Sequence, residues 1–189
     1  MRFPEHPWTA RAGRGLAQLK GGLQAVARRP MKERKVVKAS SIEVADTREK
    51  AYDELLIGGS DGQPRLYKMH REAKRVIGDD ANKVREYEAL PGRLFAVAFA
   101  PEGDRFAAGS SLDGKGEVRV YNVNDGKRLA TLEGQKGAVY TVAFSHDGKT
   151  VASAGFDGLV RLNDVATGKL VKEFVSVPLA PPGTKTTQK

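Results

Sequence analysis

Short apolar runs separated by glycine-containing turns dominate residues 94–174. LFAVAFA (94–100) and AVYTVAF (138–144) are nearly continuous apolar runs of strand length, as expected for strands buried on both faces. Each run leads into a turn, PEGD or SHDGK, and then into a second strand rich in small residues. The pattern predicts antiparallel strands joined by tight turns, with leading strands at 94–99 and 139–144 and both faces of the second one buried.

The same pattern occurs twice, 45 positions apart. After a hairpin that is three residues longer in the first copy, the correspondence continues to a Gly-Lys turn at 126–127 and 168–169. A period in the forties with short strands is typical of a propeller blade, a four-stranded unit that cannot bury its faces alone. The recurring pairs include Phe95 and Tyr140, Val97 and Val142, Phe99 and Phe144, Gly103 and Gly148, Val118 and Val160, and Arg119 and Arg161.

A third, degenerate copy precedes these two. LLIGGSDGQPRLYK (55–68) aligns without gaps on VASAGFDGLVRLND (151–164). Ile42 and Val44 alternate in SSIEVAD (40–46), which we predict as the leading strand of this copy. Residues 70–90 are charged and irregular, and we expect an outer strand there together with an excursion of the chain.

These repeats resemble the WD40 family over about residues 40–174, and the two later copies do so specifically. The matching elements are the strand ending VAFS or VAFA, the DG turn, and VRLND or VRVYN followed by TGK or DGK. The resemblance implies an all-β partial propeller with three four-stranded antiparallel blades, at about 39–90, 91–133 and 134–174. The short spacers and the HDGK turn look most like bacterial members.

The family's Trp-Asp pair is replaced in all three copies, by Asn163-Asp164, Tyr121-Asn122 and Tyr67-Lys68. The family braces each blade with a hydrogen-bonded His, Ser, Asp and Trp. Ser153 and Asp157 keep two members of that set, so the blades must rely more on strand packing. The residues to which the resemblance gives structural roles in the blades are Ser153, Asp157, Asp164, Gly148 and Gly103.

In this family one face of the disc, made of loops, carries the binding surface. Carried over position by position, that face includes Gly92, Ser60 and Asp61. An exposed Phe156 beside Lys136 would be an anchor, whereas a Phe156 packed on a neighbouring blade would be structural; both readings stay open. The residues expected to bind a partner are Arg93, Gln135, Lys136, Ser111, Leu112, Asp113, Phe156 and Asp157.

Charge sets the N-terminal segment apart. Residues 1–38 carry ten Lys or Arg and two acids, which is +8 of the chain's net +9. Prolines and glycines interrupt a possible helical stripe of Leu16, Leu19, Leu23 and Val26. We predict a basic arm over 1–38, disordered or marginally helical; a membrane-surface or transit helix and a phosphate-binding arm are the alternatives. Residues 175–189 are predicted to form a disordered, Pro-rich tail.

Motifs for catalysis are weak. Gly148-Lys149-Thr150 lacks the first glycine of a phosphate loop, and Ser60 in GGSDG aligns with a hairpin turn instead of a nucleophile elbow. The three histidines are isolated, and there is no cysteine. We therefore expect no catalytic residue, metal, cofactor or small-molecule substrate. The missing cysteines favour the reducing cytoplasm, although exported proteins can lack them too.

The leading hypothesis is a non-catalytic WD40-type scaffold, or a fragment of one, that binds a protein or peptide on the loop face. One alternative is a structural propeller segment whose basic arm binds nucleic acid or an anionic membrane. Another is a regulatory part of a larger multidomain enzyme. Three blades cannot close a ring, so we also expect self-association through their open edges.

Overall fold

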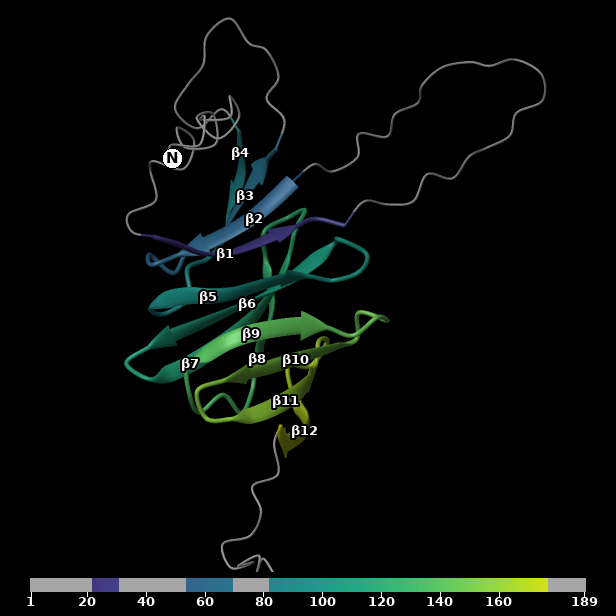
Figure 1. The fold of residues 1–189 in the computed structure, drawn as a ribbon. Coiled ribbons are helices and arrows are strands. Elements are labelled where there is room, and N and C mark those ends of the chain that lie inside the picture. Colours follow the sequence, from purple (N-terminus) through teal and green to yellow (C-terminus); the bar gives the residue numbers. More distant parts are fainter. Residues whose placement is uncertain (1–21, 31–53, 70–81, 177–189) are drawn as a thin grey trace, which may run out of the picture.

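The structure, a computed structural model, describes residues 22–30, 54–69 and 82–176, and its strands form three separate four-stranded antiparallel sheets (Figure 1). In each sheet the strands follow one another in chain order. The first sheet contains β1 (Leu23–Arg28), β2 (Glu54–Gly59), β3 (Arg65–Lys68) and β4 (Lys83–Glu86). The second contains β5 (Arg93–Phe99), β6 (Arg105–Leu112), β7 (Lys115–Asn122) and β8 (Arg128–Leu132). The third contains β9 (Val139–Phe144), β10 (Thr150–Gly155), β11 (Leu159–Asp164) and β12 (Leu170–Val175).

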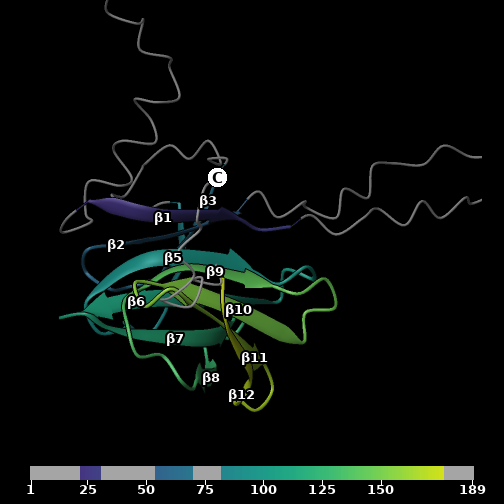
Figure 2. The ribbon, with the colours of Figure 1, turned by 60° about the horizontal axis from the view of Figure 1, so that its bottom comes forward.

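This arrangement confirms the all-β fold and the leading strands predicted for the two later copies. Each sheet is one blade, and the leading strands β1, β5 and β9 lie side by side across the three blades (Figures 1 and 2). The outer strand expected within 70–90 is β4. The strand that begins after Pro64 is the four-residue β3, whereas β7 and β11 have eight and six residues.

The prediction of a basic arm over 1–38 is wrong for Leu23–Arg28, because these residues form the strand β1. The segment LQAVAR pairs antiparallel with β2, with Val26 opposite Ile57 and Arg28 opposite Leu55. Pairing with the neighbouring strand β2 overrides the weak helical spacing that the sequence showed. The leading strand predicted at 40–46 lies outside the described residues, and β1 holds the place beside β2. Residues 1–21, 31–38 and 177–189 also lie outside them.

Arg29, counted among the charges of the predicted arm, is a buried interblade contact. Its guanidinium pairs with Glu54 at 2.7 Å and donates to the Gly103 carbonyl oxygen at 2.6 Å. It also donates to the Asn124 side chain at 3.1 Å. Because these partners satisfy the guanidinium inside the protein, Arg29 ties the first blade to the second and adds no free charge to an arm.

Two apolar clusters lie between the blades. The first joins Leu56 and Leu66 of the first blade to Leu94 and Phe106 of the second. Its rings pack in edge-to-face and stacked pairs, with Phe106 centred 4.6 Å from Tyr87 and 5.0 Å from Tyr121. Burial raises the pKa of both tyrosines to about 12. They therefore stay protonated and donate to carbonyl oxygens, Tyr87 to Val123 and Tyr121 to Glu88.

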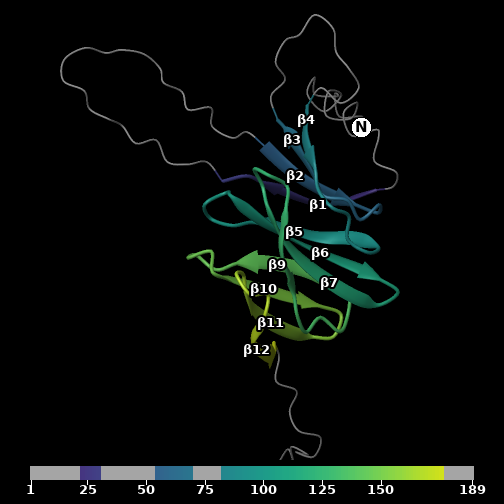
Figure 3. The same ribbon diagram turned by 180° about the vertical axis from the view of Figure 1, so that it is seen from behind.

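The second cluster joins Val118 and Val120 of the second blade to Val139 and Val151 of the third. Val142 is buried in it, as predicted, but Phe144 is only half-buried and Ala143 is exposed. The expectation that both faces of β9 are buried is therefore wrong. In the described residues no fourth blade covers the outward face of the third (Figure 3).

Candidate interaction face

The turns and strand starts at one end of the three blades form a continuous surface, which we call the loop face. It comprises the starts of β1, β5, β7 and β9, the segments leading into β5 and β9, and the turns after β2, β6 and β10. The backbones touch there: a Cβ added at Gly92 would lie 2.0 Å from the Ser111 carbonyl oxygen. One added at Gly116 would lie 2.1 Å from the Gly137 oxygen, across two blades. Only glycine allows these approaches.

Each leading strand carries a β-bulge at the same position, beside the loop face. The register shifts place Gln24, Phe95 and Tyr140 at the bulges of β1, β5 and β9. A bulge redirects the side chain of the extra residue. The Phe95 and Tyr140 rings meet edge to face, with centroids 5.5 Å apart, and Tyr140 is 50% exposed. The two later blades therefore present a partly exposed aromatic pair to solvent.

The charged and apolar residues predicted to bind a partner lie around this pair. Arg93 begins β5, and Lys136 lies in the segment leading into β9; both are exposed. Neither side chain forms a hydrogen bond or ion pair within the described ranges. Leu112 is 49% exposed, and Phe156 is 78% exposed in the β10–β11 turn. The reading of Phe156 as packed against a neighbouring blade is therefore wrong.

Asp113 lies at the tip of a hairpin that reaches farther than its counterpart in the third blade. Leu112 pairs with Lys115, so Asp113 and Gly114 are the two central residues of the turn. Both have positive φ, 50° and 79°. This is the tight turn that Asp-Gly favours between twisted strands. Ser111 is half-buried beside it, opposite Arg93.

Two of the residues expected to bind a partner are engaged inside the third blade. Gln135 donates to the Ser153 hydroxyl at 2.9 Å, and Ser153 is buried. Asp157 accepts the Leu159 amide and lies 2.6 Å from the guanidinium of Arg161, close enough for an ion pair but out of line for a hydrogen bond. Gln135 thus takes the place of the histidine in the family's bracing set. The side chains of Gln135 and Asp157 both have structural roles in this conformation.

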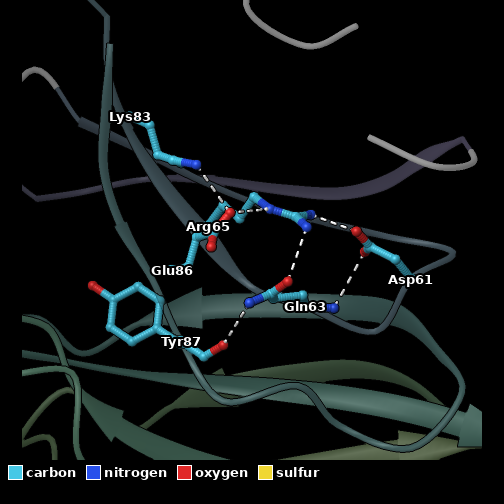
Figure 4. A network of polar contacts seen from close by, with 6 residues as sticks. All are labelled: Asp61, Gln63, Arg65, Lys83, Glu86 and Tyr87. Atoms are coloured by element: carbon cyan, nitrogen blue, oxygen red, sulfur yellow. Dashed lines mark hydrogen bonds and ion pairs between the residues drawn. The ribbon is translucent and has the colours of Figure 1, made fainter. Parts of the chain in front are cut away.

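An arginine at the same position of each third strand braces its blade. In the first blade Arg65 pairs with Asp61 at 2.5 Å and with Glu86 at 3.1 Å, and Gln63 accepts a further hydrogen bond (Figure 4). Gln63 also donates to the Tyr87 carbonyl oxygen. The network joins the β2–β3 turn to the outer strand. Ser60 donates its amide to the Gly22 carbonyl oxygen beside this network.

The third blade repeats this brace with acids at the equivalent positions, whereas the arginine of the second blade uses acids at other positions. Arg161 is 2% exposed and pairs with Asp157 and, at 2.8 Å, with Glu173 of the outer strand. Arg119 pairs with Glu117 on its own strand and with Glu88 at 3.2 Å. Strand packing is therefore assisted by ion pairs, which the sequence analysis did not foresee.

The replacements for the family's tryptophan have separate roles. Tyr121 stacks on Phe106 in the first cluster. Asn163, fully buried, donates to the Glu133 and Gly168 carbonyl oxygens, while its own side-chain oxygen has no partner. In the same β11–β12 region Asp164 accepts from the Thr167 amide and hydroxyl.

The remaining sequence motifs form ordinary turns. Gly103 and Gly148 have positive φ, 68° and 66°, in the turns after β5 and β9. Thr150 donates its amide to the Ser145 hydroxyl, so Gly148-Lys149-Thr150 closes a hairpin instead of leading into a helix. Within the described ranges, no group of three His, Cys, Asp or Glu side chains could hold a metal ion. No helix in that part of the chain could span a membrane.

Sequence reasoning missed the bracing arginines and the aromatic pair. Both sets were visible as positions that recur between the copies: Arg65, Arg119 and Arg161 align, and so do Phe95 and Tyr140. Their roles depend on the register shifts and on which acids the turns bring near, and the repeat pattern does not contain that information.

Comparison with known proteins agrees with the geometry. The profile of the family described as WD domain, G-beta repeat, matches residues 126–164. Intraflagellar transport protein 122 homolog of Xenopus tropicalis is 34% identical over 85 residues, 44% of this chain and 7% of that protein. WD repeat-containing protein 1 of Bos taurus is 29% identical over 121 residues, 57% of this chain and 20% of that protein.

WD repeat-containing protein JIP5 of Phaeosphaeria nodorum is 34% identical over 110 residues, 48% of this chain and 25% of that protein. The chain thus spans a quarter or less of the length of these three relatives. All three come from animals or fungi, so the expected likeness to bacterial members is not supported. The repeat match at 126–164, the related sequences and the three four-stranded blades agree, and together they identify WD40-type repeats in this chain.

Proposed function

We propose that this chain is a non-catalytic interaction module that binds a segment of another protein on its loop face. The observation that carries the proposal is the Phe95–Tyr140 pair, held by two bulges at the junction of two blades. Partly exposed aromatic side chains on a rigid scaffold supply large contact areas with little loss of conformational freedom on binding. Leu112 and Phe156 are further exposed apolar side chains of the loop face.

A peptide selection tests this proposal. Dodecapeptides selected from a random displayed library on the full chain are synthesised with a fluorophore, and their affinities are measured by anisotropy. We expect the Phe95→Ala, Tyr140→Ala double variant to bind them at least about ten-fold more weakly, because truncating a central aromatic anchor costs roughly 2 kcal/mol or more. Circular dichroism checks that the variant keeps its β-structure.

The matched control is Phe174→Ala, which removes an exposed ring from the outer strand β12. It should leave the affinities unchanged within about two-fold, because small surface changes away from the contact carry little energy. Equal losses in the control and in the double variant, or no loss in the double variant, would refute the loop face as the binding surface.

We also propose that the chain self-associates through its third blade. All six residues of β12 are exposed, and Val171 and Val175 are 67% and 54% accessible. β12 ends the order of its sheet, so one backbone edge has no strand partner in the described residues. Unpaired edges with apolar side chains favour pairing with another chain.

Sedimentation velocity at micromolar concentration measures this association. We expect species larger than the monomer, and more of them at high salt, because salt screens repulsion between chains of net charge +9. Charging the edge with Val171→Lys and Val175→Lys should shift the distribution toward monomer. A monomer at both salt concentrations would show that the edge is not used.

A further inference from the structure

On the loop face, most acidic side chains form ion pairs within the protein, whereas several basic side chains do not. Three of its acids are neutralised within their own blades: Asp61 by Arg65, Glu117 by Arg119 and Asp157 by Arg161. Asp113 and Glu133 are the loop-face acids without an ion pair in the described part of the chain. The bracing arginines thus remove negative charge from this surface.

Three cations of the same surface have no such partners. Arg93, Lys115 and Lys136 are all exposed, and no ion pair or hydrogen bond engages their side chains within the described residues. Lys115 and Lys136 lie next to Gly116 and Gly137, whose backbones touch, so they stand on adjoining parts of the second and third blades. Arg93 is two residues before Phe95 on β5.

We infer that the loop face selects acidic peptide segments with an apolar centre: the apolar residues would contact the Phe95–Tyr140 pair, and flanking carboxylates would meet Arg93, Lys115 and Lys136. The inference rests on the proposed peptide binding and adds the charge of the partner. Opposite charges across an interface raise the association rate and exclude partners of the wrong sign. Because these cations have no ion pair inside the protein, a carboxylate that binds them displaces only water and breaks no internal contact.

The same features favour peptide over nucleic acid. Three cations are few for a phosphate backbone, whose binding proteins commonly neutralise many more charges. The aromatic pair meets at 86°, so the edge of one ring covers the face of the other, and the pair is not an open platform for stacked bases.

Three labelled nonapeptides test the charge selection on the full chain. Each has a Leu-Phe-Leu centre, flanked on both sides by three glutamates, three serines or three lysines. At low salt we expect the glutamate peptide to bind about three- to ten-fold more tightly than the serine peptide, from two or three exposed ion pairs, and the lysine peptide to bind most weakly. The double variant Arg93→Glu, Lys136→Glu should abolish or reverse this order.

The charge-matched control is Lys127→Glu, Lys149→Glu, which changes two exposed lysines in turns at the opposite end of the blades. It has the same net charge as the test variant and should keep the wild-type order. If both double variants lose the order equally, bulk charge explains the preference and the inference fails. A labelled twelve-nucleotide thymidine strand that binds more tightly than the glutamate peptide, and loses binding in the test variant alone, would assign the face to nucleic acid instead.

The outcomes separate this inference from the proposed function. Binding that depends on Phe95 and Tyr140 but is equal for all three peptides would overturn the charge selection and leave peptide binding in place. Failure of all three peptides to bind, or binding that is indifferent to the aromatic pair, would overturn both.

Discussion

Replacing Phe106 by alanine is expected to lower the free energy of unfolding by about 3–5 kcal/mol, the cost of removing a large buried ring. Phe106 is completely buried between the first and second blades, where it contacts the rings of Tyr87, Tyr121 and Phe99. The cavity would remove contacts from both blades at once. Urea unfolding followed by circular dichroism measures the change.

Phe156→Ala is the matched control, because it makes the same chemical change at a ring that is 78% exposed. It should change the free energy of unfolding by no more than about 0.5 kcal/mol. Phe144→Ala should lie between the two, since Phe144 is half-buried at the margin of the second cluster. Similar losses for Phe106 and Phe156 would mean that the blades do not pack as described.

Replacing Arg161 by methionine is expected to cause the second large loss of stability. Arg161 is 2% exposed, and its removal would leave the carboxylates of Asp157 and Glu173 without their cation. We expect a loss of about 2–3 kcal/mol, somewhat less than for a fully buried pair because both carboxylates retain some solvent contact. Arg105→Met is the control: its pair with Asp104 is at the surface and should contribute about 1 kcal/mol or less.

The same pair makes stability depend on pH. The Arg161 guanidinium lowers the pKa of Asp157 below its ordinary value, against the opposing effect of burial. A carboxyl with a lowered pKa stabilises the fold above its unfolded pKa of about 3.9, and this contribution disappears as the pH falls through the folded value. The wild-type chain should therefore lose more stability than Arg161→Met between about pH 5 and pH 2. Parallel pH dependences would refute the ion pair.

The repeat pattern was sufficient to predict most of the fold. Residues 94–99 and 139–144 became β5 and β9 because strand alternation and glycine turns are local signals. These features depend on neighbouring residues, so a single sequence contains them.

The first blade shows what the sequence could not give. Its leading strand, Leu23–Arg28, is separated from β2 by 25 residues, so no tight turn marks the pairing. Arg28 and Arg29 add basic charge, which favoured the prediction of a basic arm. Only the partners of Arg29, which include a carbonyl oxygen of the second blade, show that it is a structural residue.

The residues expected to bind a partner differ in exposure. Arg93, Leu112, Lys136 and Phe156 lie exposed on the loop face, and the sequence alone had left Phe156 open between an exposed and a packed position. Gln135 and Asp157 turned inward because Ser153 and Arg161 offer them hydrogen-bonding and charged partners. Which partners these side chains bind depends on side-chain geometry across strands, and residue spacing along the chain does not predict that geometry.

Hydrogen–deuterium exchange of the full chain, with and without a peptide selected from the displayed library, tests most directly the claim that the loop face is the binding surface. Binding should slow amide exchange in 93–96, 112–116 and 136–141, which contain the aromatic pair and its cations. Exchange in the turns at 100–104 and 145–149, at the opposite end of the blades, should stay unchanged. Protection confined to those opposite turns, or to β12, with none around Phe95 and Tyr140, would contradict the account.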